Sequence, residues 1–239
     1  MKRPSLLKDF LIYLTVIQGK SKRTRDEYGY DLELLFRFLK CIEENVDINS
    51  EDGLLNIDIS GIDIDFIRKI TLEDLYLFLS YCEDERDNGP SAKARKVASI
   101  RAFFNYITKK RRLLTENPAE ELETPKQGRR IPIYMTYKES RQFYSGIRKT
   151  HYYRDYAIIT LFLNLGLRIS ELCSINLSSI TEEVLTIIGK GDKERAMYLN
   201  KACRGAIHNY ITKERNKLKK IIDTEALFLS QHGTRITPR

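Results

Sequence analysis

The sequence predicts a mainly helical protein that carries one small β-hairpin and folds as two domains. Apolar residues recur at helical spacing through most of the first 112 residues and again after residue 136. Between Asn117 and Pro132 the chain has three prolines and a glycine, which is typical of a connection without regular structure. Val184 to Ile188 is rich in β-branched residues and precedes a Gly191-Asp192 pair, which predicts a strand followed by a tight turn.

The first domain, residues 1–116, is predicted to contain four helices. The first runs from 5 to 18 behind Pro4. The second opens at Thr24, where Glu27 three residues later completes a capping-box pattern. The third opens at Thr71. The fourth spans 91 to about 111. The isoleucine-rich and acidic segment 45–69 is expected to be a long connection with one short ordered piece.

The fourth predicted helix combines an apolar stripe with a basic face. Val97, Ile100, Phe104 and Ile107 form the stripe, and Tyr106 is the only ionisable residue between 91 and 112 that is not basic. Small and basic side chains on the opposite face suit close approach to a DNA groove. For a single charged helix, a face that is merely solvated remains the simpler alternative.

After a linker at 117–130, residues 131–239 are predicted to form a second domain. Thr136 and Glu139 form another capping box, and a buried helix runs from Tyr152 to Leu165 and stops at Gly166. The strand at 184–188 is expected to return along 195–199. A long basic helix at 201–222 and a short extended piece at 227–229 complete the domain.

Charge and composition favour a polyanionic partner and exclude a membrane protein. The chain has 239 residues, a formal net charge of +8 and 42% hydrophobic residues. Clustered lysine and arginine displace counterions from phosphate backbones, so DNA fits this balance. The longest apolar run is too short to cross a bilayer, and the N-terminus lacks the cleavage pattern of a secretory signal, which predicts a soluble cytoplasmic protein. The four cysteines lie too far apart for zinc spacing and are expected to be reduced core residues: Cys41, Cys82, Cys173 and Cys203.

Two short motifs carry the chemistry. Leu165 to Leu172 reads LGLRISEL and places Arg168 after a glycine that can end one helix, with Ser170 available to cap the next. Ile188 to Arg195 reads IGKGDKER and places Lys190 between two glycines at a hairpin. Taken singly, Arg168 could satisfy the last carbonyls of a helix, and Lys190 could be an ordinary surface lysine.

In this order the two motifs resemble the first half of the active site of the tyrosine recombinases, the Xer and phage-integrase family. The resemblance implies that Arg168 neutralises phosphate oxygens, that Lys190 is the general acid toward the departing 5′ oxygen, and that Glu171 supports them. Arg195 also matches the motif, and its position on the return strand favours backbone contact or structural pairing over a part in the chemistry. The first domain resembles the family's helical, SAM-like core-binding domain, which clamps DNA. By this analogy the DNA contacts are Lys22, Arg23, Thr24, Arg25, Arg95, Arg101, Asn105 and Lys109.

The second half of the family's active site has no match in the sequence. It comprises a His-x-x-Arg box and a tyrosine nucleophile, whereas the last tyrosine here is Tyr210. His232 to Arg235 has the residue pattern of the box, but it comes directly after an LFLS segment. In the family such a segment is followed by a loop that leads to the true box, so we interpret His232 as a residue of that loop. We expect a C-terminally shortened recombinase with an incomplete catalytic domain that binds double-stranded DNA without cleaving it.

The resemblance further implies no metal and no cofactor, and self-association on DNA in the full-length form. The alternative is a naturally truncated, non-catalytic DNA-binding protein in which Arg168 and Lys190 only hold phosphate.

Overall fold

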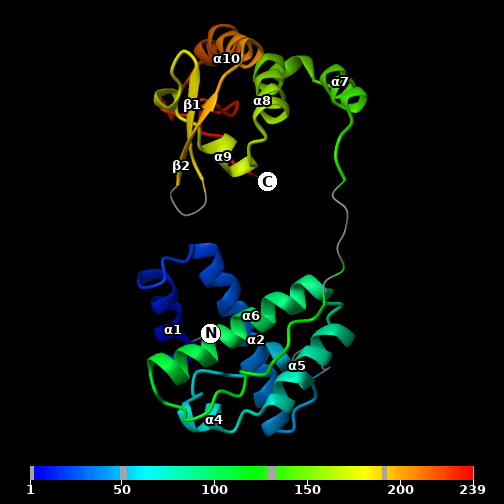
Figure 1. Ribbon diagram of the computed structural model, residues 1–239, viewed down its shortest axis with the longest axis vertical. Helices are drawn as coiled ribbons and strands as arrows, with labels where there is room; N and C mark the ends of the chain where they lie inside the picture. The colour runs from blue at the N-terminus through cyan, green and yellow to red at the C-terminus, as the bar shows by residue number, and fades with distance from the viewer. Residues whose placement is uncertain (1–2, 49–52, 127, 129–132, 190–192, 239) are drawn as a thin grey trace. The chain divides into compact units, whose positions relative to one another are not determined.

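The structure is a computed structural model that describes residues 3–48, 53–126, 128, 133–189 and 193–238. It divides into two compact units, Met1–Arg130 and Ile131–Arg239 (Figure 1). The described residues of both units are predominantly helical, and the second unit adds one two-stranded antiparallel sheet. The predicted fold class, mainly α with a small β-hairpin, is therefore confirmed.

The first unit is built from helices packed around an aromatic core. Phe103 lies at its centre, with ring centroids 5.4 Å from Phe10 and 5.5 Å from Phe36. All three side chains are fully buried, because apolar residues at helical spacing place one face of each helix inward. The helices are α1 (Ser5–Val16), α2 (Lys22–Glu43), α3 (Gly53–Asn56), α4 (Ile64–Arg68), α5 (Leu72–Asp84) and α6 (Pro90–Asn105), which continues as a π-helical turn over Tyr106–Lys110.

The start of α2 differs from the prediction. The helix begins at Lys22, and the hydroxyl of Ser21 accepts a hydrogen bond from the backbone N–H of Thr24. Thr24 therefore lies within the first turn and does not cap the helix. At α5 the predicted helix start at Thr71 is confirmed, and the structure adds a capping box with Asp74, in which each side chain accepts from the other residue's backbone N–H.

The segment between α2 and α5 is more ordered than predicted. It contains two short helices, α3 and α4, and Asp63 caps α4 by accepting from two backbone amides. The isoleucines of this segment, among them Ile59 and Ile67, are buried in the core of the first unit. Tertiary burial of these side chains stabilises short helices that would not form alone.

The proline-rich segment begins as part of the first unit. Ala119 and Leu122 are buried in the same core as α1 and α6, and the side chain of Asn117 accepts from the backbone N–H of Ala119. The structure thus places these residues, which we predicted to belong to a linker from 117, in the first unit. Burial of the apolar side chains of Ala119 and Leu122 stabilises this packing, although the segment has no regular secondary structure.

The second unit packs helices against the hairpin. Its elements are α7 (Tyr137–Ser145), a 3-10 turn at Lys149–His151, α8 (Tyr152–Leu165), α9 (Ile169–Ser174), a 3-10 turn at Leu177–Ser179, β1 (Val184–Ile188), β2 (Glu194–Tyr198), α10 (Lys201–Lys213) and a 3-10 turn at Arg215–Lys217. Helices α8 and α10 lie side by side (Figure 1). Tyr210 of α10 stacks on Phe228 with the ring centroids 5.3 Å apart, at the centre of this core.

Two helix predictions for this unit need correction. The bounds of α8 match the predicted helix, yet Tyr152 and Leu163 are exposed, so the helix is only partly buried. The predicted long helix at 201–222 ends at Lys213. It ends there because Arg215 turns inward and donates to the backbone carbonyls of Thr224 and Ala226, which the continued helix would not allow.

The four cysteines are free and buried, as predicted. Burial raises the pKa of the Cys82 thiol to about 11, so the thiol stays protonated at neutral pH. Within the described ranges, no helix combines the length and the apolar character needed to span a bilayer.

Candidate functional site

Arg168 stands at the corner between α8 and α9. Gly166 ends α8 in the left-handed conformation with φ 60° and ψ 35°, as predicted, and its N–H donates to the carbonyl of Phe162 at 3.0 Å. Arg168 is the N-cap residue of α9, so Ser170 lies inside the helix and the prediction that it caps α9 is wrong. Glu171 satisfies the free amide instead, because its Oε2 accepts the backbone N–H of Arg168 at 2.8 Å.

Glu171 is the centre of a cluster of charges. Its side chain is only 4% exposed, and Oε1 accepts from Nη1 of Arg168 at 2.8 Å. Oε2 also accepts from Nη2 of Arg195, on β2, at 2.9 Å. The Arg168 side chain is 67% exposed. A buried carboxylate therefore fixes the position of a guanidinium that remains open to solvent.

The charge state of Glu171 follows from these contacts. Burial alone would favour the neutral acid, but the hydrogen bonds from the amide and guanidinium of Arg168 and the charge of Arg195 outweigh it. The net effect lowers the pKa of Glu171 below its ordinary value. At neutral pH the carboxylate is ionised and holds both arginines.

The hairpin brings its first glycine to the same cluster. Strands β1 and β2 pair with Ile187 opposite Arg195 and Ile188 opposite Glu194, and the N–H of Gly189 donates to the carbonyl of Lys193 at 2.8 Å. A Cβ on Gly189 would lie 3.7 Å from Oε1 of Glu171. Lys190, which follows Gly189 in the sequence, lies outside the described residues, as do Gly191 and Asp192.

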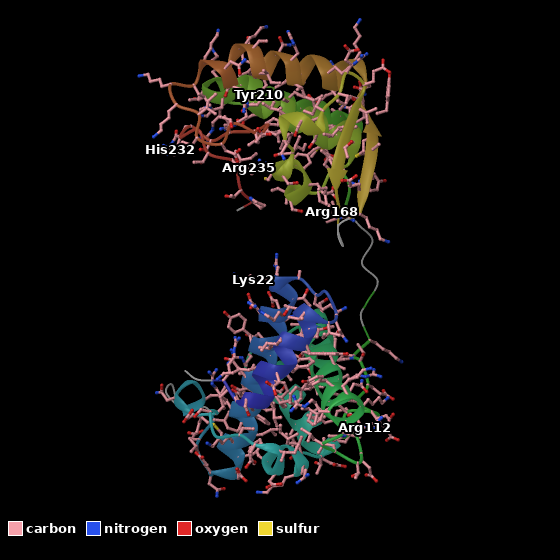
Figure 2. All side chains as sticks on the ribbon, turned by 90° about the vertical axis from the view of Figure 1, so that its left-hand side faces the viewer. Lys22, Arg112, Arg168, Tyr210, His232 and Arg235 are labelled. Carbon is pink, nitrogen blue, oxygen red and sulfur yellow. The ribbon has the colours of Figure 1, made fainter. Side chains whose placement is uncertain are left out.

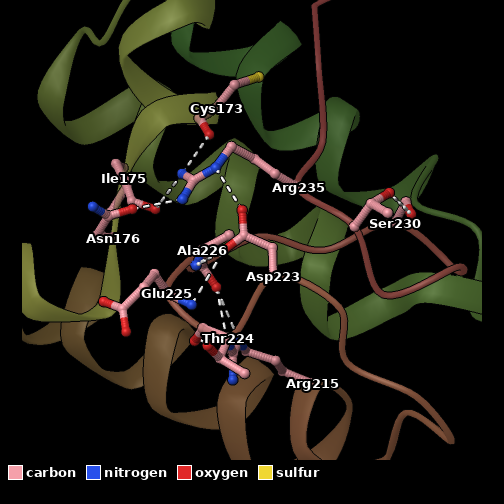
Figure 3. A network of polar contacts seen from close by, with 11 residues as sticks. Cys173, Ile175, Asn176, Arg215, Asp223, Thr224, Glu225, Ala226, Ser230 and Arg235 are labelled. Carbon is pink, nitrogen blue, oxygen red and sulfur yellow. Dashed lines mark hydrogen bonds and ion pairs between the residues drawn. The ribbon is translucent and has the colours of Figure 1, made fainter.

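Two arginines that the sequence analysis did not assign hold the elements behind the site (Figure 3). Arg235 donates from Nη1 to the carbonyls of Cys173 and Ile175 at the end of α9, both at 3.2 Å, and from Nε to Asp223 at 3.0 Å. Arg215 donates to the carbonyl of Ala226 at 2.9 Å. The sequence gives no sign of these roles, because the carbonyls they contact are remote in the chain.

His232 is an exposed turn residue, as we interpreted it from the sequence, and Figure 2 shows it away from Arg168. Arg235, the arginine of the same four-residue sequence, donates to the carbonyls of Cys173 and Ile175 at the end of α9. In the part of the chain that the structure describes, the sequence His232-Gly233-Thr234-Arg235 therefore forms a structural turn.

Tyr210 lies inside the second unit, beneath the ribbon of α10 (Figure 2). Its side chain is 1% exposed, and its hydroxyl accepts the backbone N–H of Leu229 at 3.0 Å. Burial raises the pKa of this phenol. Tyr210 therefore has neither the access nor the ionisation that a nucleophile needs.

Four of the eight candidate DNA contacts in the first unit are partly buried and have partners within the protein. Arg95 donates to Asp31 at 2.6 Å and also contacts Glu27, and Arg25 pairs with Asp26 at 2.7 Å. The Thr24 hydroxyl is bonded to Ser21 at 2.9 Å. The remaining member of this group, Asn105, accepts from the Asn117 side chain at 3.3 Å.

The other four candidates are exposed. Lys22 and Arg23 lie on the first turn of α2, and Arg23 approaches Glu27 at 4.0 Å with most of its side chain in solvent. Arg101 lies on α6, and Lys109 lies on the π-helical turn, 3.9 Å from Glu120. In contrast, Lys93 and Lys96 of the basic segment are buried, so that segment is not one continuous basic face.

Comparison with known proteins identifies the family. Residues 134–239 match the model of the "Phage integrase family". The tyrosine recombinase XerC of Caldanaerobacter subterraneus subsp. tengcongensis is 47% identical over 237 residues, which cover 99% of this chain and 66% of that protein. This chain therefore spans about two thirds of the length of that relative.

Solved structures show the same fold. A lambda integrase (75-356) dimer bound to a COC' core site matches with a TM-score of 0.62 and 16% identity, over 98% of this chain and 75% of that one. A lambda integrase tetramer bound to a Holliday junction matches with a TM-score of 0.63 and 17% identity, over 98% and 61%. The XerC identity, which extends through both units, and the family match over the second unit show that the chain belongs to the phage integrase family of tyrosine recombinases.

Proposed function

We propose that this protein is a site-specific recombinase by family that binds duplex DNA, with Arg168 and Lys190 at the phosphate where strands are exchanged. The observation that carries the proposal is the exposed guanidinium of Arg168, held by the buried carboxylate of Glu171 beside Gly189 of the hairpin. Phosphodiester cleavage requires charge neutralisation at the nonbridging oxygens and a proton for the leaving oxygen. Arg168 supplies the first, and Lys190 supplies the second.

The fixed position of Arg168 supports a role in catalysis as well as in binding. A guanidinium has five N–H donors in a planar fork, which matches two oxygens of one phosphate. Because Glu171 holds Nη1, the remaining donors are oriented before DNA arrives. A positioned donor stabilises developing charge without reorganisation during the reaction.

The first unit provides further contacts in this proposal. Lys22, Arg23, Arg101 and Lys109 are exposed and are retained as phosphate contacts. Arg25, Arg95, Asn105 and Thr24 are engaged within the protein, so their part is to hold α2 and α6 in position. The DNA-bound dimer and tetramer of lambda integrase support double-stranded DNA as the partner and self-association on it. A recombinase of chromosomal DNA would work in the cytoplasm at the nucleoid.

Replacing Arg168 with glutamine is expected to weaken DNA binding about tenfold, because one charge-assisted phosphate contact is lost. The slope of log K against log salt should fall by about 0.9. The measurement is fluorescence anisotropy with a labelled duplex at a series of salt concentrations. Arg204→Gln is the matched control, since Arg204 is also an exposed arginine of the second unit and pairs with Glu183 at 3.6 Å. Equal losses of DNA affinity in the two variants would contradict the proposal that Arg168 contacts a phosphate.

We further propose that residues 1–239 bind DNA without forming a phosphotyrosine adduct. Tyr210 is buried, and no tyrosine follows it in the sequence. Incubation with a nicked suicide duplex, followed by denaturing electrophoresis, should give no covalent complex. A complex that survives denaturation, with a tyrosine of this chain identified by peptide mass spectrometry, would refute this part of the proposal while leaving DNA binding intact.

A further inference from the structure

We infer that Arg195 is a second phosphate-binding residue of the site, which forms with Arg168 a two-guanidinium cradle on the shared carboxylate of Glu171. The inference rests on the proposed function and extends it, because the sequence left backbone contact and structural pairing open for Arg195 and did not place it at the reacting phosphate. The ligand is the phosphodiester of a DNA strand.

The hairpin register explains how Arg195 reaches the site. Arg195 lies directly opposite Ile187, and directly opposed residues of an antiparallel pair project from the same face of the sheet. Ile187 is buried in the core of the second unit, so this face is turned toward that core. Near the turn of the hairpin, one residue pair from its last pair, Arg195 extends from this face to Glu171 of α9.

The charges of the cluster do not balance. Glu171 is a single negative charge between two guanidiniums, and both of its oxygens already accept hydrogen bonds. One arginine would be sufficient to neutralise a buried carboxylate. The second guanidinium leaves the cluster with an excess positive charge on its exposed side, which an incoming phosphate would neutralise.

The structural arginines of the same unit look different. Arg235 uses Nε, Nη1 and Nη2 on Asp223, two backbone carbonyls and the Asn176 side chain, and Arg215 is buried against carbonyls. Arg195 makes a hydrogen bond from Nη2 alone among the described residues, and its side chain is 45% exposed. Arg168 likewise uses only Nη1 of its guanidinium within the described part of the chain. Donors directed away from Glu171 are thus left for a ligand on both residues.

Arg195→Gln tests the inference with the binding assay described for Arg168. The expected result is a loss of affinity of about tenfold and a fall of about 0.9 in the salt slope, since one phosphate contact disappears. Arg204→Gln is again the control, because its side chain is 40% exposed and loses the same charge in the same unit. Its affinity and slope should remain at the wild-type values.

The possible outcomes separate the two proposals. If Arg195→Gln keeps the wild-type affinity and slope while Arg168→Gln loses them, Arg195 is structural and the inference fails, but the proposed function stands. If Arg204→Gln loses as much as Arg195→Gln, the effect is one of overall charge, and the inference fails. If the wild-type protein does not bind the duplex, the proposed function fails and the inference fails with it.

A second measurement does not depend on the folding of a variant. Phenylglyoxal modifies accessible arginines, and peptide mass spectrometry reports the rate for each one in the wild-type protein with and without the duplex. DNA should slow the modification of Arg195 and Arg168 several-fold and leave Arg204 unchanged. An Arg195 rate that DNA does not change would overturn the inference, because a bound phosphate must cover the free guanidinium nitrogens.

Discussion

Replacing Gly233 with alanine is expected to destabilise the second unit by about 3–5 kcal/mol. Gly233 has φ +75°, and a Cβ at this position would lie 2.1 Å from the backbone carbonyl oxygen of Lys220. The neighbouring backbone cannot move freely, because the amides of Ile222 and Asp223 both donate to the carbonyl of Gly233, at 2.8 and 3.0 Å. Hydrogen exchange at the amides of 227–229, measured with and without the substitution, gives the change in unfolding free energy.

Gly166→Ala is the matched control for this substitution. Gly166 has φ +60°, but a Cβ there would meet nothing within 4 Å. Only the cost of the left-handed conformation remains, about 1–2 kcal/mol. If the two substitutions destabilise the unit equally, the turn around Gly233 does not pack against Lys220 as the structure shows.

The Gly233 turn also bears on the functional site. The turn leads directly into Arg235, which holds the carbonyl ends of α9, and α9 carries Glu171. A displaced turn should therefore weaken DNA binding even though Gly233 does not contact Arg168. Comparing the affinity of Gly233→Ala with that of the wild-type protein at a temperature where both are folded tests this connection.

Replacing Asp31 with alanine is expected to destabilise the first unit by about 3–5 kcal/mol. Asp31 is 2% exposed and accepts from Lys96 at 3.1 Å and from Arg95 at 2.6 Å. Lys96 is also buried, so removal of the carboxylate leaves an ammonium without its counter-charge in the core. Urea unfolding followed by circular dichroism, with hydrogen exchange in α6 to assign the transition, measures the loss.

Asp26→Ala is the control for Asp31→Ala. Asp26 lies on the same helix and pairs with Arg25, but both side chains are partly exposed, and such a pair contributes less than about 1 kcal/mol. The double variant Asp31→Leu, Lys96→Met should recover much of the lost stability, because it removes the unpaired buried charge together with its partner. A loss of under about 1 kcal/mol in Asp31→Ala would show that Lys96 reaches solvent without Asp31.

The best sequence predictions were those that depend on contacts within a few residues. The bounds of α8, the left-handed Gly166 and the capping box at Thr136 all agree with the structure. Each is decided by hydrogen bonds or backbone conformations that span at most four residues, so neighbouring letters are sufficient to predict it.

The predictions that failed depended on contacts remote in the chain. α10 was predicted to continue to 222, but Arg215 binds carbonyls at 224 and 226 and the helix ends at Lys213. The basic face of α6 was predicted without knowledge of Asp31, a residue of α2 that engages Arg95 and Lys96. Ser170 is a residue type that often caps helices, but α9 begins one residue before it, and the Glu171 side chain accepts the backbone N–H of the N-cap residue, Arg168.

The amino-acid sequence by itself determined the family and the positions of Arg168, Glu171 and Lys190, because the two motifs and their order are written in adjacent residues. Only the tertiary structure decided which charges are available to a ligand. Arg95, Arg168, Arg195 and Arg235 are the same residue type in the sequence. Their roles differ because of the groups that the fold brings to each guanidinium. Arg235 uses Nε, Nη1 and Nη2 on groups remote in the chain, and Arg95 is bound to the buried carboxylate of Asp31, whereas Arg168 and Arg195 keep donors exposed beside Glu171.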